Sequence, residues 1–377
     1  MDIQNQTKKT IVVIPAYEPP SSFIDYVSTL LENGINEIIV VNDGSNNNYQ
    51  HVFDAIKQFD NVTVLEYPDN KGKGYALKHA FKHVFDNYDE NLVIVTADCD
   101  GQHCVNDVLS LSATASEHPN ALVLGSRDFS KHNVPPRSRF GNLNTRRLFK
   151  LLYGIKIADT QTGLRAFDSS ILINMLKISG DRFEYEMNML IVLFKQNIHF
   201  IEVPIETIYN KKADDVEKRS HFKTFSDSIK VYNVLFKNVQ TYLLAVIISG
   251  LIELSVFALC QYYLFAKLFI KPYLVTLLAT VTARIISSIV NFFMNYKLVF
   301  AGKSKSSAIR YYTLWLGLLT CSYLLTNLFG NVLKLPILVF KLITDLALSI
   351  ASYRIQTVWV FPHKNTYKRK KKKQKSA

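Results

Sequence analysis

The chain has 377 residues, of which 48% are hydrophobic and 20% charged, and its formal net charge is +13. A charge of this sign indicates an anionic partner, which leaves nucleic acid, phospholipid headgroups and a phosphorylated substrate as candidates. Polar residues are spread over roughly the first 238 residues, whereas long apolar runs dominate the rest until a lysine-rich end. This apolar half favours membrane headgroups and argues against nucleic acid.

The cysteines and the N-terminal residues argue against a secreted protein. The four cysteines form no CxxC pair and show no metal-ligand spacing: Cys99, Cys104, Cys260 and Cys321. Such usage does not fit a disulfide framework. Residues 1–9 are polar and lack the apolar core of a cleavable signal peptide. We therefore expect the N-terminal part to stay in the cytoplasm.

Five short apolar runs in the first half are typical of buried strands: 10–16, 37–43, 62–67, 92–98 and 121–127. Segments with helical spacing of apolar residues lie between them, and this alternation predicts an α/β domain with a mostly parallel sheet. Polar residues follow the strands: Tyr17, Glu18, Asp43, Asp98, Asp100 and Arg127. Ligands of open parallel sheets bind beyond the carboxyl ends of the strands, so we expect these side chains to share one crevice.

The most informative cluster is Asp98-Cys99-Asp100-Gly101-Gln102. Two carboxylates one residue apart at a strand end can reach one hard divalent cation, and the Gln102 carbonyl oxygen can complete the shell. Such a cation, Mg²⁺ or Mn²⁺, would neutralise a diphosphate leaving group. The glycine-rich segment 70–74 lacks the phosphate-loop pattern, so it does not indicate ATP binding.

Four apolar stretches in the second half have about the ~20 residues that a membrane-spanning helix needs: 240–265, 273–298, 311–333 and 336–360. Basic residues gather after the second and fourth stretches, which predicts that both termini are cytoplasmic. Charged residues within these stretches, such as Glu253 and Arg284, are costly unless they are paired or face a polar cavity. Arg284 and Arg354 are candidates for a lipid phosphate.

The apolar half also contains a weak internal repeat. Segments 291–300 and 352–361 both begin with polar and aromatic residues and end in Val-Phe. An aromatic belt common to many spans is one explanation, and a duplicated helical hairpin is the one we favour.

The ordered motifs of the first half resemble family 2 glycosyltransferases of the GT-A fold. They comprise 14–18, 40–45, 71–77, 98–102, 125–127 and 159–167. Within that family the chain looks most like dolichol-phosphate-mannose synthases and bacterial polyprenyl-phosphate glycosyltransferases. The apolar half is similar to GtrA-like membrane domains. The implied fold is a Rossmann-like GT-A domain followed by an all-α domain of four transmembrane helices.

The resemblance implies site residues in three groups. Nucleotide would be held by Pro15, Tyr17, Glu18, Asp43 and Asp98, and the metal by Asp98, Asp100 and Gln102. The donor or acceptor phosphate would be bound by Arg127, Arg139, Arg165, Arg219, His221 and Lys223. Asp100, Arg127 and Asp159 would be catalytic, although Asp159 is equally suited to holding the 161–165 turn.

The implied reaction is inverting transfer of a hexose or hexosamine from a UDP- or GDP-linked donor to a polyprenyl phosphate, undecaprenyl or dolichyl. A lipid phosphate is ionised near neutral pH, so the nucleophile needs charge neutralisation and positioning more than a strong base. The product would be a lipid-linked sugar for cell-envelope glycosylation. We expect a multi-pass cell-membrane protein with a cytoplasmic catalytic domain and no nucleic-acid partner; assembly into a homo-oligomer stays open.

We expect four parts: a GT-A domain (1–222), a juxtamembrane interfacial helix (223–238), the GtrA-like domain (239–361) and a basic tail (362–377). Segments 145–153 and 222–236 mix basic with large apolar residues, as helices on a membrane surface do. Two alternatives stay open. A processive polysaccharide synthase would normally carry a Gln-x-x-Arg-Trp motif, which this sequence lacks. A flippase or scaffold for lipid-linked sugar would not need the acidic metal site.

Overall fold

A computed structural model describes residues 8–88, 91–130, 134, 136–206, 224–265, 272–300, 306–329, 333, 337–362 and 367–369. The chain forms two compact units. The first comprises 1–150, 155–234 and 365–377, and the second comprises 151–154 and 235–364. The finer division into four parts stays a prediction.

The first unit is built on an eight-stranded sheet of order β3-β2-β1-β4-β6-β5-β7-β8. The strands are β1 (Lys9–Ala16), β2 (Glu37–Asp43), β3 (Val62–Tyr67), β4 (Leu92–Thr96), β5 (Ala121–Ser126), β6 (Arg165–Asp168), β7 (His199–Pro204) and β8 (Tyr367–Arg369). Only β6 runs antiparallel to its neighbours, β4 and β5. The predicted α/β class with a mostly parallel sheet is confirmed.

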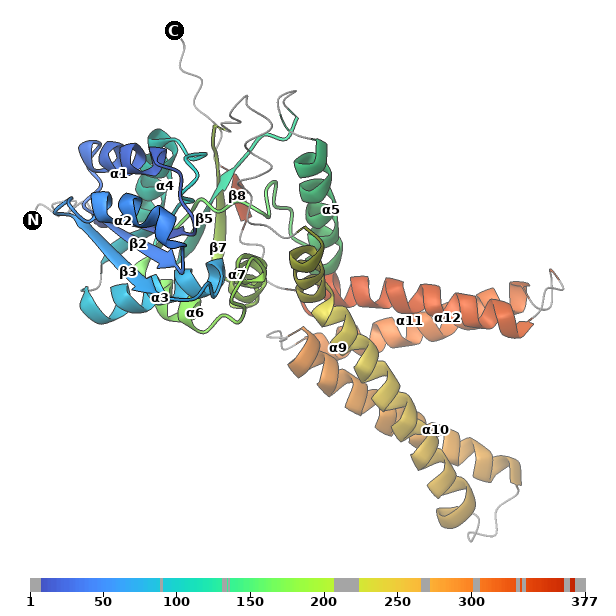
Figure 1. Ribbon diagram of the computed structural model, residues 1–377. Helices are drawn as coiled ribbons and strands as arrows, with labels where there is room; N and C mark the ends of the chain where they lie inside the picture. The colour runs from blue at the N-terminus through green and yellow to red at the C-terminus, as the bar shows by residue number, and fades with distance from the viewer. Residues whose placement is uncertain are drawn as a thin grey trace, which may run out of the picture. The chain divides into compact units, whose positions relative to one another are not determined.

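Helices cover both faces of this sheet (Figure 1). They are α1 (Ser22–Glu32), α2 (Gln50–Ile56), α3 (Lys73–Asn87), α4 (Val105–Glu117), α6 (Leu172–Leu176) and α7 (Glu184–Lys195), with short 3₁₀ turns at Asn47–Tyr49 and Ser169–Ile171. The chain also forms α5 (Pro136–Tyr153). Alternate strand residues such as Val12 and Val40 pack with α1, α2 and α4 in one core cluster. The intervening residues, such as Val13, are also fully buried. Burial on both sides explains why the strands read as continuous apolar runs.

The strand register brings the polar strand ends together. Ala16 of β1 pairs with Asn42 of β2, and Val13 pairs with Thr96 of β4. Because β4 and β5 both run antiparallel to β6, they point the same way. The residues after β1, β2, β4 and β5 therefore lie along one edge of the sheet, as the sequence predicts.

The second unit is helical. Its main helices are α9 (Thr224–Leu259, entering this unit at Leu235), α10 (Pro272–Met294), α11 (Ser307–Asn327) and α12 (Ile337–Ile355). The π-helical turns η3 (Cys260–Leu264), η4 (Asn295–Val299) and η6 (Gln356–Val360) follow α9, α10 and α12. The described residues of all four predicted apolar stretches thus lie mainly on helices.

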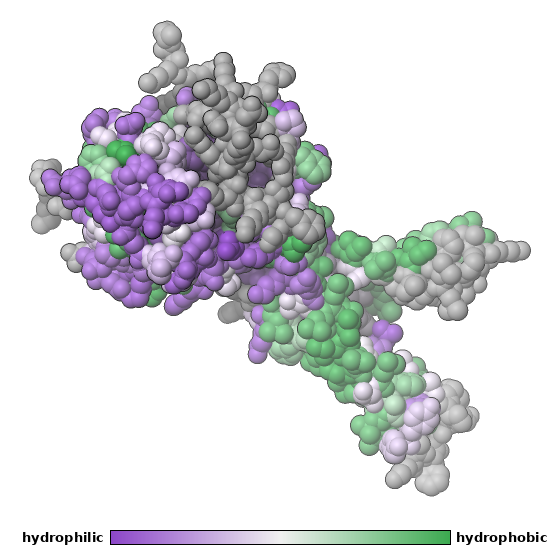
Figure 2. All heavy atoms as spheres, viewed as in Figure 1, coloured by the Kyte–Doolittle hydropathy of each residue, from purple (hydrophilic) through white to green (hydrophobic). Residues whose placement is uncertain are grey.

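Within the described residues, two helices are long and apolar enough to cross a bilayer: Asp227–Leu264 and Leu274–Val299, with mean hydropathies of 2.5 and 1.6. Only 17% of each apolar window is buried, which is unlike the core helix of a soluble protein. Figure 2 shows the apolar side chains of this unit on its surface. These two helices indicate membrane association, whereas a four-span topology is not established.

The two copies of the weak repeat have the same local structure. Each ends in a π-helical turn, closed by bonds from Phe300 N–H to Asn295 O and from Phe361 N–H to Gln356 O. The rings of Phe300 and Phe361 stack with centroids 5.0 Å apart. This equivalence favours the duplicated hairpin over a generic aromatic belt.

Candidate active site

Asp43, the last residue of β2, organises the glycine-rich loop that precedes α3. Its carboxylate is 3% exposed and accepts hydrogen bonds from Lys71 N (2.8 Å), Gly72 N (2.9 Å) and Tyr67 Oη (2.8 Å). Burial raises the pKa of Asp43, although these donors oppose the shift. Gly44 has a φ of 65°, and a Cβ there would overlap the backbone of this loop. The Asp-Gly pair thus fixes the loop beside the crevice.

Asp98 stands at the centre of a charged cluster after β4. Lys73 Nζ lies 2.7 Å from Asp98 Oδ1 and 2.8 Å from Glu186 Oε1. His103 Nε2 lies 3.2 Å from the other Asp98 oxygen. Burial would raise the pKa of Asp98, but Lys73 and His103 outweigh it and hold the pKa below its usual range. The carboxylate is therefore ionised at neutral pH, with Lys73 and His103 as its counter-charges.

Asp100 follows in the same turn, where Gly101 has a φ of 71°. Its Oδ1 accepts a hydrogen bond from Gln102 N at 3.0 Å, and burial followed by the charge of Asp98 raises the pKa of Asp100. Mutual repulsion of this kind is relieved by a shared cation. Burial and the two carboxylates raise the pKa of the Cys99 thiol to about 12, so it stays neutral.

The donor set fits a hard cation whose remaining ligands come from a substrate. The described residues contain no group of three or more His, Cys, Asp and Glu side chains that could hold a metal ion. Mg²⁺ is commonly bound by only one or two carboxylates together with substrate phosphates. Asp98, Asp100 and the Gln102 amide meet that requirement.

Arg127, directly after β5, is held by a buried carboxylate. Its Nε lies 2.6 Å from Asp159 Oδ2 and its Nη2 lies 3.2 Å from Asp159 Oδ1. Asp159 is 0% exposed and also accepts a hydrogen bond from Gln161 N at 3.0 Å. Asp159 therefore orients Arg127 and closes the turn before β6. The Arg127 side chain stays 21% exposed and can reach a ligand.

The other predicted site residues are placed differently. Arg165 is 0% exposed, and it donates to Thr162 O at 3.0 Å and to Glu186 O at 2.8 Å. Burial lowers its pKa. Its Nη2 has no partner among the described residues, and its contact with a phosphate stays a prediction. Arg139 is exposed on α5. Arg219, His221 and Lys223 lie outside the described residues.

At the end of β1, Pro15, Tyr17 and Glu18 are partly buried. Glu18 has a φ of 51°, and its N–H donates to Ser45 Oγ at 2.9 Å. Burial and the adjacent Glu18 raise the pKa of Tyr17. The hydrogen bond between Glu18 and Ser45 joins the loops after β1 and β2, where nucleotide contacts are predicted.

Sequence reasoning missed three side chains around Asp98, namely Lys73, His103 and Glu186. The signal for Lys73 was present, since it lies in the glycine-rich segment that was set aside because it is not a phosphate loop. Glu186 lies 88 positions after Asp98 in sequence and gave no local signal. Gly163 was also missed: its backbone packs against the Asp98 carboxylate and leaves no room for a side chain.

Comparison with known proteins shows the family of the chain. The model of "Glycosyl transferase family 2" matches residues 11–176. A UDP-N-acetylglucosamine–dolichyl-phosphate N-acetylglucosaminyltransferase of Methanococcus voltae is 30% identical over 223 residues, covering 54% of this chain and 87% of the relative. A dolichyl-phosphate β-glucosyltransferase of Saccharomyces cerevisiae is 26% identical over 226 residues, covering 52% and 65%.

Among solved structures, glucosyl-3-phosphoglycerate synthase from Mycobacterium tuberculosis, bound to Mn²⁺ and UDP, aligns with a TM-score of 0.46 and 17% identity. The alignment covers 61% of this chain and 79% of that one. The chain belongs to glycosyl transferase family 2, and it is a glycosyltransferase. The family match lies in the first unit, so the likeness of the second unit to GtrA-like domains stays a prediction.

Proposed function

We propose that the protein transfers one hexose or N-acetylhexosamine from a nucleotide sugar to a polyprenyl phosphate, with inversion of the anomeric centre. The observation that carries this proposal is the placement of Arg127 at the same sheet edge as Asp98 and Asp100. The acidic pair would bind the metal ion of the donor diphosphate, and the oriented arginine would bind the acceptor phosphate. Two such sites are expected when both donor and acceptor carry phosphate. The names of the two dolichyl-phosphate relatives support the same acceptor class.

Each side chain has a distinct task in this proposal. Asp98, Asp100 and Gln102 hold Mg²⁺ or Mn²⁺, which when bound neutralises the departing diphosphate. Tyr17 and Glu18 contact the nucleotide, and Asp43 fixes the loop that carries Lys73. Arg127 binds the acceptor phosphate and aligns its oxygen with the anomeric carbon. Asp159 acts through Arg127, because its oxygens are occupied by that arginine and by Gln161 N.

The acceptor phosphate needs no general base. Its oxygen is already ionised near neutral pH, so the residues around it bind and orient it without removing a proton. Because no proton has to be removed, Asp159 can be fully buried and paired with Arg127 and still contribute by orienting that arginine.

The two apolar helices support a location at a membrane, where a polyprenyl lipid resides. On α5, Phe140 is 68% exposed and Leu151 52% exposed, next to the basic residues of that helix. Such a surface suits contact with headgroups. We infer a cytoplasmic catalytic unit, because nucleotide sugars are made in the cytoplasm and the basic residues follow the positive-inside rule.

The test uses purified full-length protein in detergent with labelled UDP- and GDP-sugars. Polyprenyl phosphate, the corresponding polyprenol and free monosaccharides serve as acceptors. We expect a mild-acid-labile product from the phosphate alone. Asp100→Asn should abolish transfer, whereas the matched control Asp86→Asn, on the exposed face of α3, should not. Transfer to a hydroxyl with the lipid phosphate ignored would refute the proposal.

A further inference from the structure

Asp159, which holds Arg127, lies in a segment without regular secondary structure. All of residues 154–164 are described, and none of them lies in a helix or strand. Asp159 and Thr160 are nevertheless buried. Buried backbone N–H and C=O groups need hydrogen-bond partners. For the residues on either side of Asp159, side chains of α5 and β7 supply these partners.

Asn142 of α5 bonds to the backbone on both sides of Asp159. Its Nδ2 donates to Ala158 O at 3.2 Å, and its Oδ1 accepts from Thr160 N at 3.3 Å. An asparagine amide carries both donors and an acceptor, so it can pair with one C=O and one N–H as a neighbouring strand would. Asn142 is 2% exposed. Its amide therefore fixes the backbone from which the Asp159 side chain extends.

Two further buried side chains hold the same segment. Glu202 of β7 accepts a hydrogen bond from Ala158 N with its Oε1 at 2.6 Å. The hydroxyl oxygens of Thr145, on α5, and Thr160 lie 3.0 Å apart. We call Asn142, Thr145 and Glu202 the backbone clamp. The backbone clamp holds the segment from two elements, α5 and β7.

The inward face of α5 changes from polar to apolar along the helix. Its buried residues are Asn142, Thr145, Phe149, Leu152 and Tyr153, at the spacing of one helix face. Burial of an amide costs free energy unless it is hydrogen-bonded, and asparagine is a weaker helix former than leucine. The two polar residues stand where α5 meets residues 158–160. Their contacts with that segment offset the cost of burying them.

The backbone clamp and Arg127 depend on neighbouring strands. Leu124 of β5 pairs with Glu202 of β7, and Arg127 comes directly after β5. The two-point contact between a carboxylate and a guanidinium requires a defined orientation of both groups. A shift of the backbone around Asp159 would therefore disturb its contact with Arg127.

We propose that Asn142 and Glu202 are positioning residues for the acceptor phosphate. They fix the backbone next to Asp159, Asp159 orients the guanidinium of Arg127, and Arg127 binds the phosphate. This inference rests on the proposed function, which makes Arg127 the acceptor-phosphate residue. None of the contacts of the backbone clamp described above involves the acidic residues after β4, so its loss should weaken acceptor binding and leave donor binding unchanged.

Separate Michaelis constants for the two substrates test the proposal. The full-length protein is purified in detergent and assayed with polyprenyl phosphate and the nucleotide sugar that it accepts. Asn142→Ala should raise the KM for polyprenyl phosphate about fivefold, the factor expected for one lost hydrogen bond. The KM for the nucleotide sugar should not change. Asn144→Ala, on the same helix but only partly buried, is the matched control and should leave both constants unchanged.

Conservative variants separate positioning from packing. Glu202→Leu removes the oxygen that accepts from Ala158 N and should raise the KM for polyprenyl phosphate. Glu202→Gln keeps such an oxygen and should raise this KM less than Glu202→Leu does. Thr145→Val removes only a hydroxyl and should also raise it, which keeps the test open if Asn142→Ala does not fold.

A double-mutant cycle shows whether the backbone clamp acts through Arg127. In an Arg127→Ala background, Asn142→Ala should raise the KM for polyprenyl phosphate no further, because the group that it positions is gone. A residue that only supports the fold would add its own loss in both backgrounds.

The outcomes separate this inference from the proposed function. An unchanged KM for polyprenyl phosphate in both Asn142→Ala and Glu202→Leu, or an equal rise in the KM of both substrates, would overturn the inference alone. Additive effects of Asn142→Ala and Arg127→Ala would do the same. Wild-type protein that transfers no sugar to polyprenyl phosphate would reject the proposed function and, with it, the acceptor role of the backbone clamp.

Discussion

Lys73 Nζ lies 2.7 Å from Asp98 Oδ1 and supplies the counter-charge of the carboxylate that we assign to a metal ion. Lys73→Met should leave the half-buried Asp98 and the more deeply buried Glu186 as neighbouring carboxylates without the lysine between them. Removing one partner of a buried ion pair typically costs about 3 kcal/mol. We expect a lower Tm in detergent without metal, and a larger rise in Tm on adding Mn²⁺ than the wild type shows. An equal Mn²⁺ effect in both proteins would remove Asp98 from the metal site.

Arg127 and Asp159 should act as one unit. Arg127→Ala should lower kcat/KM for the lipid phosphate about 100-fold, and Arg127→Lys should recover only part because lysine cannot make a planar two-point contact. Asp159→Asn should lower the same kcat/KM about tenfold, because Arg127 would lose the carboxylate that orients it. The control Asp128→Asn changes an exposed carboxylate that accepts from Ser130. Steady-state kinetics measure these effects. An unchanged kcat/KM for Asp159→Asn would contradict the role of Asp159 in orienting Arg127.

Gly163 gives a steric test of the Asp98 position. A Cβ there would lie 2.9 Å from Asp98 Cγ and closer to both carboxylate oxygens. The Gly163 carbonyl is anchored by Thr96 Oγ1 at 2.7 Å, so the carboxylate must move. Gly163→Ala should therefore lose most activity with a small loss of stability. Gly141→Ala, whose Cβ would meet only Gln161 Oε1 at 3.9 Å, should keep its activity. Equal activity of the two variants would show that the Asp98 position is not critical.

The basic residues predict the topology. Reporters fused after Asn238 and at Ala377 should both read cytoplasmic, and one near Lys271 should read outside. The reporters after Asn238 and at Ala377 lie on the same side only if an even number of spans separates them. A terminal reporter on the outside would require an odd number and would refute the four-span expectation.

The sequence predicts the sheet and its functional edge because strand patterning and polar strand ends are local signals. Asp98, Asp100 and Arg127 are found from such signals alone. The partners of these residues depend on how α3, α7 and the turn before β6 pack, which no local pattern encodes. The burial of Arg165 shows the limit: an arginine in a family-like motif is fully buried, and its guanidinium donates to the backbone carbonyls of Thr162 and Glu186.

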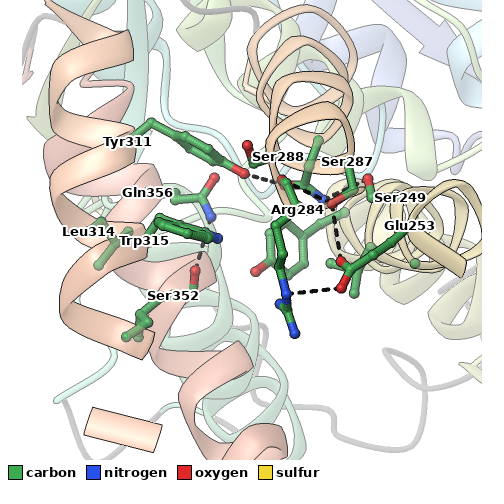
Figure 3. Close-up of a pocket in the computed structure, with 15 residues that line it drawn as sticks. Ser249, Glu253, Arg284, Ser287, Ser288, Tyr311, Leu314, Trp315, Ser352 and Gln356 are labelled. Carbon is green, nitrogen blue, oxygen red and sulfur yellow. Dashed lines mark hydrogen bonds and ion pairs between the residues drawn. The ribbon is translucent and has the colours of Figure 1, made fainter. Parts of the chain in front are cut away.

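The same limit applies to the second unit. The apolar stretches and the repeat are visible in sequence, whereas the ion pair between Glu253 of α9 and Arg284 of α10 forms only when these helices pack (Figure 3). Glu253 and Arg284 are 31 positions apart, and their pairing was foreseen only as a general requirement for charges in spans.

The mass of the lipid product tests the central claim most directly. Purified protein is given polyprenyl phosphate and the nucleotide sugar that it accepts, and the lipid and nucleotide products are identified by mass spectrometry. We predict one added hexosyl or N-acetylhexosaminyl group per lipid phosphate and an equal amount of nucleoside diphosphate. A ladder of several sugars would indicate a polysaccharide synthase. A lipid gaining sugar plus phosphate, with release of nucleoside monophosphate, would contradict transfer to the lipid phosphate.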